Sequence, residues 1–241
     1  MNIEVWSDFV CPFCYIGKRR LELALEQFPN KEDVTVAYKS YELDPNAEEN
    51  PGKSIHELLA AKYGMSVEKA KKSNEEMGKQ AAELGLIYHF DSMKHTNTFD
   101  AHRVAQYAKD KGKGNQVTER LLKAYFTDSE LISNHDTLAR LAGEAGLNQE
   151  DVRAMLETDD YKRHVRADEQ EAGQLGVEGV PFFVFNNKYG VSGAQPQEVF
   201  LEVLEKVWEE ERSEPALQSL TPKKSKTTYC TDEGCEVVEE D

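Results

Sequence analysis

The chain has 241 residues, of which 39% are apolar and 9% aromatic, enough to form a folded globular core. Its net charge of −16 argues against nucleic acid as a partner, because phosphate binding requires clustered Lys and Arg. No apolar run reaches the length of a membrane span, and no basic, apolar leader precedes the first strand pattern. We therefore expect a cytoplasmic protein that does not contact membranes.

The first predicted element is a short strand at residues 3–7, where apolar and polar side chains alternate. A helix follows it, and a second strand is predicted over residues 34–41. From Ser54 the apolar spacing becomes helical. Ser54 and Glu57 form a capping-box pattern, and Gly64 is placed to end this helix. Further helices are predicted over 66–84, 98–111, 115–126, 136–145, 148–156 and 161–175.

Strand patterns return only near the end, where residues 182–185 and 189–192 flank a short polar turn and should pair as an antiparallel hairpin. A last amphipathic helix is predicted over 197–211. The sheet-forming segments therefore bracket the helical ones. We expect an α/β fold in which 1–53 and 176–212 form one discontinuous domain, 54–159 a helical insertion, 160–175 a linking helix and 213–241 a tail.

The tetrapeptide Cys11-Pro12-Phe13-Cys14 lies where the first strand passes into the first helix. Two thiols separated by two residues can close a small disulfide ring. The first sulfur would stand near unpaired backbone N–H groups and the positive end of the helix dipole, which favour a thiolate. Because the thiolate is the species that attacks disulfides, this arrangement predicts thiol–disulfide exchange.

Zinc binding is the alternative use of such a cysteine pair. A four-cysteine site would have to join Cys11 and Cys14 to Cys230 and Cys235, which lie near the other end of the chain. No Cys or His at ligand spacing flanks either pair in the sequence. We therefore expect no metal, and no other cofactor, in this protein.

Several motifs occur together in an order that resembles the DsbA family of thiol–disulfide oxidoreductases, and within it the FrnE-type branch. The resemblance covers residues 2–208, and the combination is far more specific than any single motif. The motifs are Asp8-Phe9-Val10-Cys11-Pro12-Phe13-Cys14-Tyr15-Ile16-Gly17, Glu42-Leu43-Asp44-Pro45, Asn97-Thr98 with Ala101-His102-Arg103, Gly179-Val180-Pro181-Phe182-Phe183 and Ser192-Gly193-Ala194-Gln195.

This resemblance implies a thioredoxin fold interrupted by a helical insertion domain. It implies that Cys11 is the exposed nucleophile and that Cys14 is the buried resolving thiol. It also makes Pro181 a cis-proline facing the two thiols, with the backbone of Val180 available to pair with a substrate chain. From the residues alone, Pro181 is equally a proline that opens a strand, where its missing N–H is tolerated.

Other side chains near these motifs are candidates for substrate contact. Phe13 and Phe9, with Trp6, are interpreted as an apolar rim for unfolded peptide, although a core role for Phe9 and Trp6 remains open. The resemblance places the start of the helix at Asn97 near the active-site groove. His102, on the same helix, is interpreted either as a base or as a structural histidine.

Cys230 and Cys235 enclose four residues that include a glycine, so a loop there can close into a disulfide. One interpretation is an incidental pair in a tail. The other is an accessory redox pair on an arm, which would exchange electrons with Cys11 and Cys14 because tethering raises the effective thiol concentration.

The sequence therefore predicts a thiol–disulfide oxidoreductase or isomerase acting on protein or peptide disulfides, with glutathione or a thioredoxin-type reductant as electron source. The first alternative is a glutathione-dependent isomerase of small molecules resembling 2-hydroxychromene-2-carboxylate isomerase. Such enzymes typically carry serine at the first active-site position, which this chain does not. The second alternative is a redox-gated holdase chaperone. Physiological substrate, reduction potential, direction of electron flow and oligomeric state are not specified by the sequence.

Overall fold

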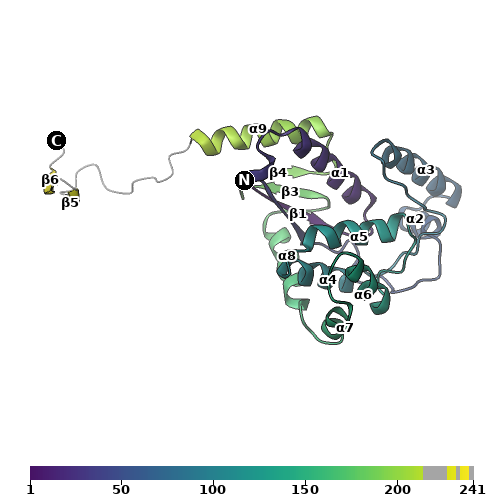
Figure 1. Ribbon diagram of the computed structural model, residues 1–241. Helices are drawn as coiled ribbons and strands as arrows, with labels where there is room; N and C mark the ends of the chain where they lie inside the picture. The colour runs from purple at the N-terminus through teal and green to yellow at the C-terminus, as the bar shows by residue number, and fades with distance from the viewer. Residues whose placement is uncertain (214–226, 232–233, 239–241) are drawn as a thin grey trace. The chain divides into compact units, whose positions relative to one another are not determined.

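The computed structural model describes residues 1–213, 227–231 and 234–238 (Figure 1). The chain divides into two compact units, Met1–Val207 and Trp208–Asp241. Within the described residues, no helix combines the length and the apolar character that crossing a membrane requires.

The first unit is built on a four-stranded sheet in the order β2-β1-β3-β4. Strand β1 pairs in parallel with β2 and antiparallel with β3, and β3 and β4 form an antiparallel hairpin. Because β1 pairs with both β2 and β3, and β3 also pairs with β4, β1 and β3 lie inside the sheet while β2 and β4 lie at its edges. The long connection between β1 and β3 contains the helical part of the chain. The strands are β1 (Asn2–Ser7), β2 (Thr35–Ser40), β3 (Phe182–Phe185) and β4 (Tyr189–Ser192).

Side-chain alternation gives the sheet two apolar faces. One face is covered by helices α1 (Pro12–Gln27) and α9 (Gln197–Ser213), and there the Phe183 ring lies 4.7 Å from the Phe200 ring. The other face is covered by α8 (Lys162–Gln174), where Trp6 packs with Ala172 and its indole N–H donates to the Asp168 carbonyl at 2.8 Å. A short 3₁₀ turn, η1 (Lys31–Asp33), joins α1 to β2.

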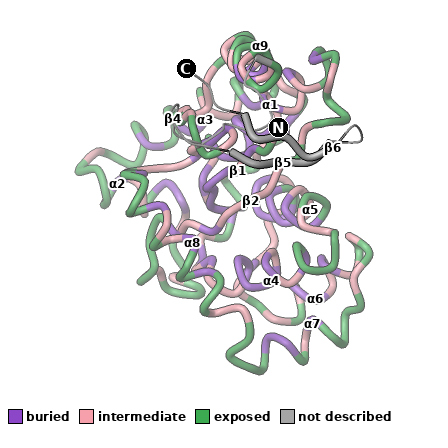
Figure 2. The backbone as a smooth tube through the Cα atoms, turned by 90° about the vertical axis from the view of Figure 1, so that its left-hand side faces the viewer, coloured by how far each residue is buried: buried purple, intermediate pink, exposed green. Residues whose placement is uncertain are grey.

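Six helices form most of the connection between β2 and α8. Ser54 and Glu57 make the expected capping box at the start of α2, and Gly64 ends that helix with a positive φ of 60°. Figure 2 shows buried stretches along α4, α5 and α6. The helices are α2 (Ile55–Tyr63), α3 (Val67–Glu83), α4 (Phe99–Asp110), α5 (Gly114–Phe126), α6 (His135–Glu144) and α7 (Gln149–Leu156).

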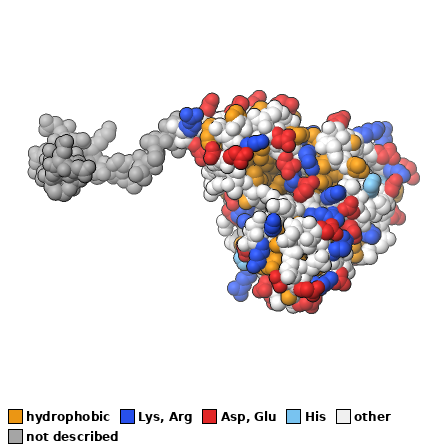
Figure 3. All heavy atoms as spheres, in the orientation of Figure 1, with side chains coloured by type: hydrophobic (Ala, Val, Ile, Leu, Met, Phe, Trp, Pro, Cys, Tyr) orange, Lys and Arg blue, Asp and Glu red, His pale blue; other side chains and the backbone are white. Residues whose placement is uncertain are grey.

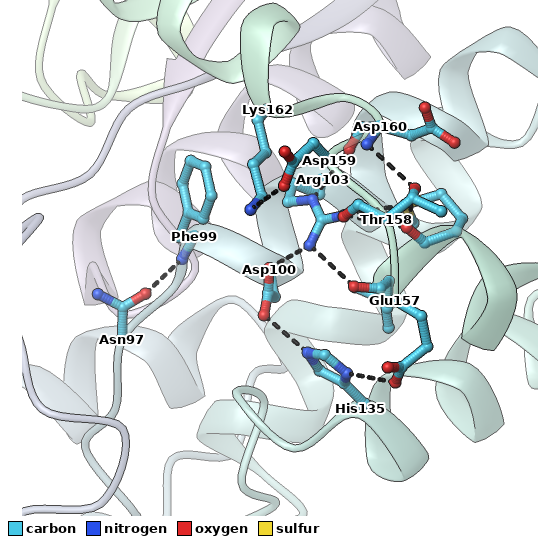
Figure 4. A network of polar contacts seen from close by, with 12 residues as sticks. Asn97, Phe99, Asp100, Arg103, His135, Glu157, Thr158, Asp159, Asp160 and Lys162 are labelled. Atoms are coloured by element: carbon cyan, nitrogen blue, oxygen red, sulfur yellow. Dashed lines mark hydrogen bonds and ion pairs between the residues drawn. The ribbon is translucent and has the colours of Figure 1, made fainter.

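A buried arginine fixes the end of α7 against α4 (Figure 4). Arg103 is 2% exposed, and its guanidinium donates to the carboxylate of Asp100 at 2.7 Å. The remaining N–H groups donate to backbone carbonyls at the end of α7 and in the turn after it. These acceptors are the carbonyls of Met155, Leu156, Thr158 and Asp160, at 3.0, 3.3, 2.6 and 2.9 Å.

The predicted α/β fold class is confirmed, and the predicted helices and strands of the first unit agree with the structure to within a few residues. The division of this unit into a discontinuous domain (1–53 and 176–212) and an insertion (54–159) stays a prediction. The tail contains two strands that the sequence reading did not predict. They are β5 (Thr227–Thr231) and β6 (Gly234–Val238), which pair antiparallel with Cys230 opposite Cys235.

Candidate active site

The first cysteine caps the first helix. Cys11 is the N-cap residue of α1, with φ −89° and ψ 112°, and Pro12 occupies the first helical position, where a missing N–H costs nothing. A short turn connects the end of β1 to this helix, and in it the Cys11 N–H donates to the Asp8 carbonyl at 3.2 Å. The Cys11 sulfur therefore stands at the positively polarised end of a 16-residue helix.

The Val180–Pro181 segment lies directly against this sulfur. The peptide bond between the two residues is cis, and the Cys11 thiol donates to the Val180 carbonyl with an Sγ–O distance of 3.6 Å. The Pro181 carbonyl accepts from Gly193 N–H at 2.8 Å, which ties this segment to the residue after β4. The structure thus brings together three residues from opposite ends of the first unit: Cys11, Val180 and Pro181.

A glycine permits α1 to approach this segment closely. A Cβ atom at Gly17 would lie 3.0 Å from Pro181 Cγ and 3.1 Å from Phe183 Cζ. Both neighbours are buried and neither is a flexible chain end. Gly17 therefore allows the helix that carries both cysteines to lie beside Pro181.

The second cysteine, Cys14, is enclosed by the end of β1 and the loop after it. Its sulfur accepts a hydrogen bond from the Asp8 N–H at 3.5 Å. Burial raises the pKa of the Cys14 thiol well above its usual value, and the hydrogen bond and charge of Cys11 raise it further. Hydrogen bonds from the Ser7 hydroxyl and from the Asp8 backbone act in the opposite direction. Cys14 is therefore held as a protonated thiol at neutral pH.

The expectation that Cys11 is exposed is wrong. Only 4% of Cys11 is accessible, against 2% of Cys14. The physical reason is the contact just described, because the sulfur is enclosed between the start of α1 and the Val180 carbonyl.

The apolar rim is smaller than expected. Phe13 is 44% exposed and remains a candidate for substrate contact, whereas Phe9 and Trp6 are buried. The Phe9 ring packs 4.8 Å from the His102 ring, so Phe9 belongs to the core. Leu43 is an exposed apolar side chain, 42% accessible, and its N–H donates to the Asp8 carboxylate at 2.8 Å. Leu43 lies in one of the sequence motifs but was not among the predicted substrate contacts.

Asn97 has a structural environment. Its side-chain amide donates to the carbonyls of Pro45 and Ala47 at 3.4 and 3.3 Å, and its oxygen accepts from Phe99 N–H at 2.9 Å (Figure 4). These contacts tie the loop after β2 to the start of α4. These bonds use the side-chain amide of Asn97 within the protein, and its substrate-binding role stays a prediction.

Tyr88, which sequence reasoning did not single out, links the helical region to the cysteine motif. Its hydroxyl donates to the Pro12 carbonyl at 2.9 Å, and its ring stacks on Phe126 at 4.4 Å. Burial raises the pKa of Tyr88, and nearby Tyr15 and both active-site cysteines raise it further, so the hydroxyl stays a donor. The residue lies in the loop between α3 and α4, and no sequence motif points to it.

Other features of the surface do not involve the cysteines. A groove of about 950 Å³ lies between α1, β2 and α5, with Leu21, Leu25 and Val36 in its lining. Figure 3 shows apolar side chains gathered in this hollow, with charged side chains around it.

Within the described residues, no group of three or more His, Cys, Asp or Glu is arranged to hold a metal ion.

Fold and site together define a thioredoxin-type oxidoreductase fold with a cysteine pair at a helix N-terminus. The DSBA-like thioredoxin domain family matches residues 2–205, and the chain belongs to this family. The crystal structure of a probable DsbA oxidoreductase from Streptomyces coelicolor is similar over 99% of both chains, with 40% identity and a TM-score of 0.85.

Two more distant structures share the fold. A 2-hydroxychromene-2-carboxylate isomerase is 13% identical, with a TM-score of 0.67 over 88% of this chain and 98% of its own. The cytosolic disulfide reductase DsbM from Pseudomonas aeruginosa is also 13% identical, with a TM-score of 0.61 over 87% of this chain and 99% of its own. The family assignment is therefore confirmed, and membership of the FrnE-type branch stays a prediction.

Proposed function

We propose that this protein is a thiol–disulfide oxidoreductase that exchanges disulfides with protein or peptide substrates through Cys11 and Cys14. The observation that carries this proposal is the placement of the Cys11 sulfur at the N-terminus of α1, 3.6 Å from the Val180 carbonyl, with Cys14 one turn further along the helix. Family membership and 40% identity to a probable DsbA oxidoreductase support it.

In the reductive direction, the Cys11 thiolate attacks one sulfur of a substrate disulfide. A bond forms between Cys11 and that sulfur, and the other substrate sulfur leaves as a thiolate. Cys14 then loses its proton and attacks the Cys11 sulfur, which releases the second substrate thiolate and leaves a Cys11–Cys14 disulfide. The substrate gains two electrons and the protein loses two, and the oxidative direction is the reverse.

The substrate chain is proposed to lie along the Val180–Pro181 segment. The backbone of this segment suits an extended peptide, because backbone hydrogen bonds to a substrate chain form whatever its side chains are. Phe13 and Leu43 supply the apolar contacts, since both are more than 40% exposed. In this proposal Phe9 does not contact the substrate, because its side chain is buried in the core.

Electrons are proposed to come from glutathione or a thioredoxin-type reductant in the cytoplasm. Support for this location comes from the fold shared with a cytosolic disulfide reductase. Cys230 and Cys235 are proposed as an accessory redox pair that receives or supplies electrons at the active site.

The test is an insulin-reduction assay with glutathione or a thioredoxin system as electron source. Precipitation of the reduced insulin reports the rate. Wild type should accelerate the reaction, and Cys11→Ser should not. The competing function is glutathione-dependent isomerisation of a small aromatic substrate, which the shared fold with a 2-hydroxychromene-2-carboxylate isomerase makes the natural comparison. Isomerisation without insulin reduction would refute our proposal, and protection of unfolded chains that survives Cys11→Ser would favour a holdase instead.

A further inference from the structure

The groove between α1, β2 and α5 is a surface that the proposed function does not use. Its volume is about 950 Å³, and none of its lining residues belongs to the site formed by Cys11, Cys14 and the Val180–Pro181 segment. Helix α1 contributes to both places, but Leu25 in the groove lies about 20 Å along the helix axis from Cys11. The groove is therefore separate from the sulfurs.

Strand β2 forms one side of this groove and is an edge strand, so half of its backbone groups face away from the sheet. Thr35 N–H donates toward β1, to the carbonyl of the residue that precedes this strand, at 3.0 Å. Ser40 N–H donates away from β1, to the Asp168 carboxylate on α8, at 2.9 Å. Because successive residues of a parallel strand direct their backbone groups to opposite sides, Val36 and Tyr38 direct theirs away from β1.

The outward backbone groups of Val36 and Tyr38 have no hydrogen-bond partner among the residues that the structure describes. Both residues line the groove and are half-buried, as is most of β2, whereas the central strands β1 and β3 are mostly buried. An open edge of this kind pairs readily with a further strand, because main-chain hydrogen bonds then satisfy both chains. The groove therefore suits a segment in extended conformation.

The side chains of the groove define which extended segment fits it. Leu25, Val36 and Tyr38 line the groove together with other apolar side chains, which Figure 3 shows gathered in the hollow. In an extended chain, successive side chains point to opposite faces. A segment with apolar residues at every second position therefore packs these against the groove while its other side chains face away.

The charges of the groove favour an acidic segment. The whole chain contains 45 acidic and 29 basic side chains, but the groove is lined by five basic and four acidic ones. Three of these four acids pair with neighbouring bases. Within the described chain, Lys31 and Lys123 form no ion pair, and Glu26 is the one lining acid that also lacks one. The two lysines are therefore available to carboxylates of a bound segment.

We propose that this groove binds an extended, acidic segment of a partner protein as an added strand beside β2. The backbone of the segment pairs with Val36 and Tyr38, its alternate apolar side chains contact the apolar lining, and its carboxylates meet Lys31 and Lys123. No covalent bond forms or breaks at this surface. The inference therefore stands apart from the proposed function, and its test does not use the cysteines.

The test measures binding of a labelled peptide to the full chain by fluorescence anisotropy. The probe is Glu-Glu-Val-Thr-Val-Thr-Val-Glu-Glu with capped ends, which combines apolar residues at alternate positions with acidic flanks. We expect saturable binding at low ionic strength that weakens about tenfold in about 0.5 M salt. Affinity should also fall about tenfold when lysine replaces the glutamates, or when the three central residues are N-methylated so that neither edge of the peptide can donate.

Val36→Pro tests the backbone contact. Because Val36 N–H faces away from β1, its loss leaves the hydrogen bonds between β1 and β2 intact. Val36→Ala is the matched control, since it shortens the side chain but keeps the N–H. We expect Val36→Pro to weaken binding of the acidic peptide about tenfold, and Val36→Ala to weaken it at most about threefold.

Lys31→Glu/Lys123→Glu tests the charges without changing the strand, and it keeps the inference testable if Val36→Pro does not fold. This variant should weaken the glutamate peptide about tenfold and strengthen the lysine peptide. Lys69→Glu/Lys72→Glu, on α3 and outside the groove, is the matched control because it changes the net charge equally. It should leave both affinities within about twofold of wild type.

Three results would overturn the inference. One is the absence of saturable binding below about 1 mM acidic peptide. Another is equal binding of the parent and N-methylated peptides, or equal effects of the two lysine double variants. The third is a concentration-dependent dimer that Val36→Pro dissociates, because a second copy of the chain would then fill the groove. Failure of insulin reduction would refute the proposed function and leave this test unaffected.

Discussion

The two cysteine pairs of this chain are built in different ways. Cys11 and Cys14 belong to one helix end, where a buried sulfur faces the Val180 carbonyl and a second lies against Asp8. Cys230 and Cys235 belong to a two-stranded hairpin, whose register places their Cα atoms directly opposite each other. Opposed residues in antiparallel strands lie about 4.5–5.5 Å apart, within the range that a disulfide spans.

The comparison separates two requirements of thiol chemistry. Pairing of two strands is sufficient to place the Cα atoms of two cysteines opposite each other. At Cys11 and Cys14, the helix end adds a positively polarised N-terminus and the adjacent Val180 carbonyl. We therefore expect the first pair to set the rate of disulfide exchange, and the second pair to influence only how electrons reach it.

The sharpest test of this difference is to remove each pair in turn. Cys11→Ser should lower insulin reduction by at least about 10³-fold, because the attacking sulfur is lost. Cys230→Ser/Cys235→Ser should change the rate with a chemical reductant by less than about threefold, since such a reductant bypasses the tail. Equal losses in the two proteins would show that the pairs act as one centre.

Cys14→Ser should lower turnover by about 10²-fold, because release of the mixed disulfide then waits for an external thiol. The protein should accumulate in a covalent complex through Cys11, which mass spectrometry can identify. Under mild oxidation without substrate, a link from Cys11 to Cys230 or Cys235 would support the accessory redox pair. Complete absence of that link, with substrate complexes still forming, would remove the tail from the reaction.

The close packing of α1 against Pro181 predicts an intermediate effect. Gly17→Val should destabilise the protein by about 1–3 kcal/mol, since Pro181 and Phe183 leave no room for a side chain. It should also slow exchange about tenfold, because the Cys11 sulfur moves relative to Val180. The readouts are urea unfolding and insulin reduction.

Gly173→Val, on α8, is the matched control for Gly17→Val. Beyond its own helix, no atom of the described chain lies within 4 Å of the Cβ position at Gly173. This variant should therefore retain its exchange rate, and a comparable loss there would attribute the effect to helix propensity instead of contact with Pro181.

The smallest expected effect is a change in the pH dependence of stability. Burial, with the hydrogen bond and charge of Cys11, raises the pKa of Cys14 in the folded reduced protein. The unfolded chain therefore binds fewer protons above about pH 8.5, its ordinary thiol value, and stability falls as pH rises toward the folded pKa. Urea unfolding of Cys14→Ala between about pH 7 and 10 should show a shallower fall than wild type, whereas the tail double variant should match wild type.

Local patterns predicted the frame of the molecule well. The alternation at residues 3–7, the Ser54–Glu57 capping box and the polar turn before Tyr189 each determine structure through neighbours in sequence, and all appear as predicted. The tail strands carried a signal too, because threonine and valine favour strands at 227–231 and 234–238. Residues 213–241 contain few apolar side chains, and for that reason the sequence predicted a tail and not strands.

The environment of the sulfurs could be predicted only in part. The motif order identified Cys11, Cys14, Val180 and Pro181 as candidates, and the structure brings these residues together. The burial of Cys11 and Phe9 depends on contacts with segments far away in sequence, which no spacing reveals. The same holds for the contact between Asp8 and His102, separated by 94 positions.

The hydrogen bond from Tyr88 to the Pro12 carbonyl has a consequence for protein engineering. It connects the helical region to the first turn of α1, which carries the two cysteines, with an O–O distance of 2.9 Å. A chimera that exchanges the helical region with that of a relative has to supply a donor at this place, or the first turn of α1 loses one of its anchors. Keeping a tyrosine at position 88 is therefore a design rule for any such exchange.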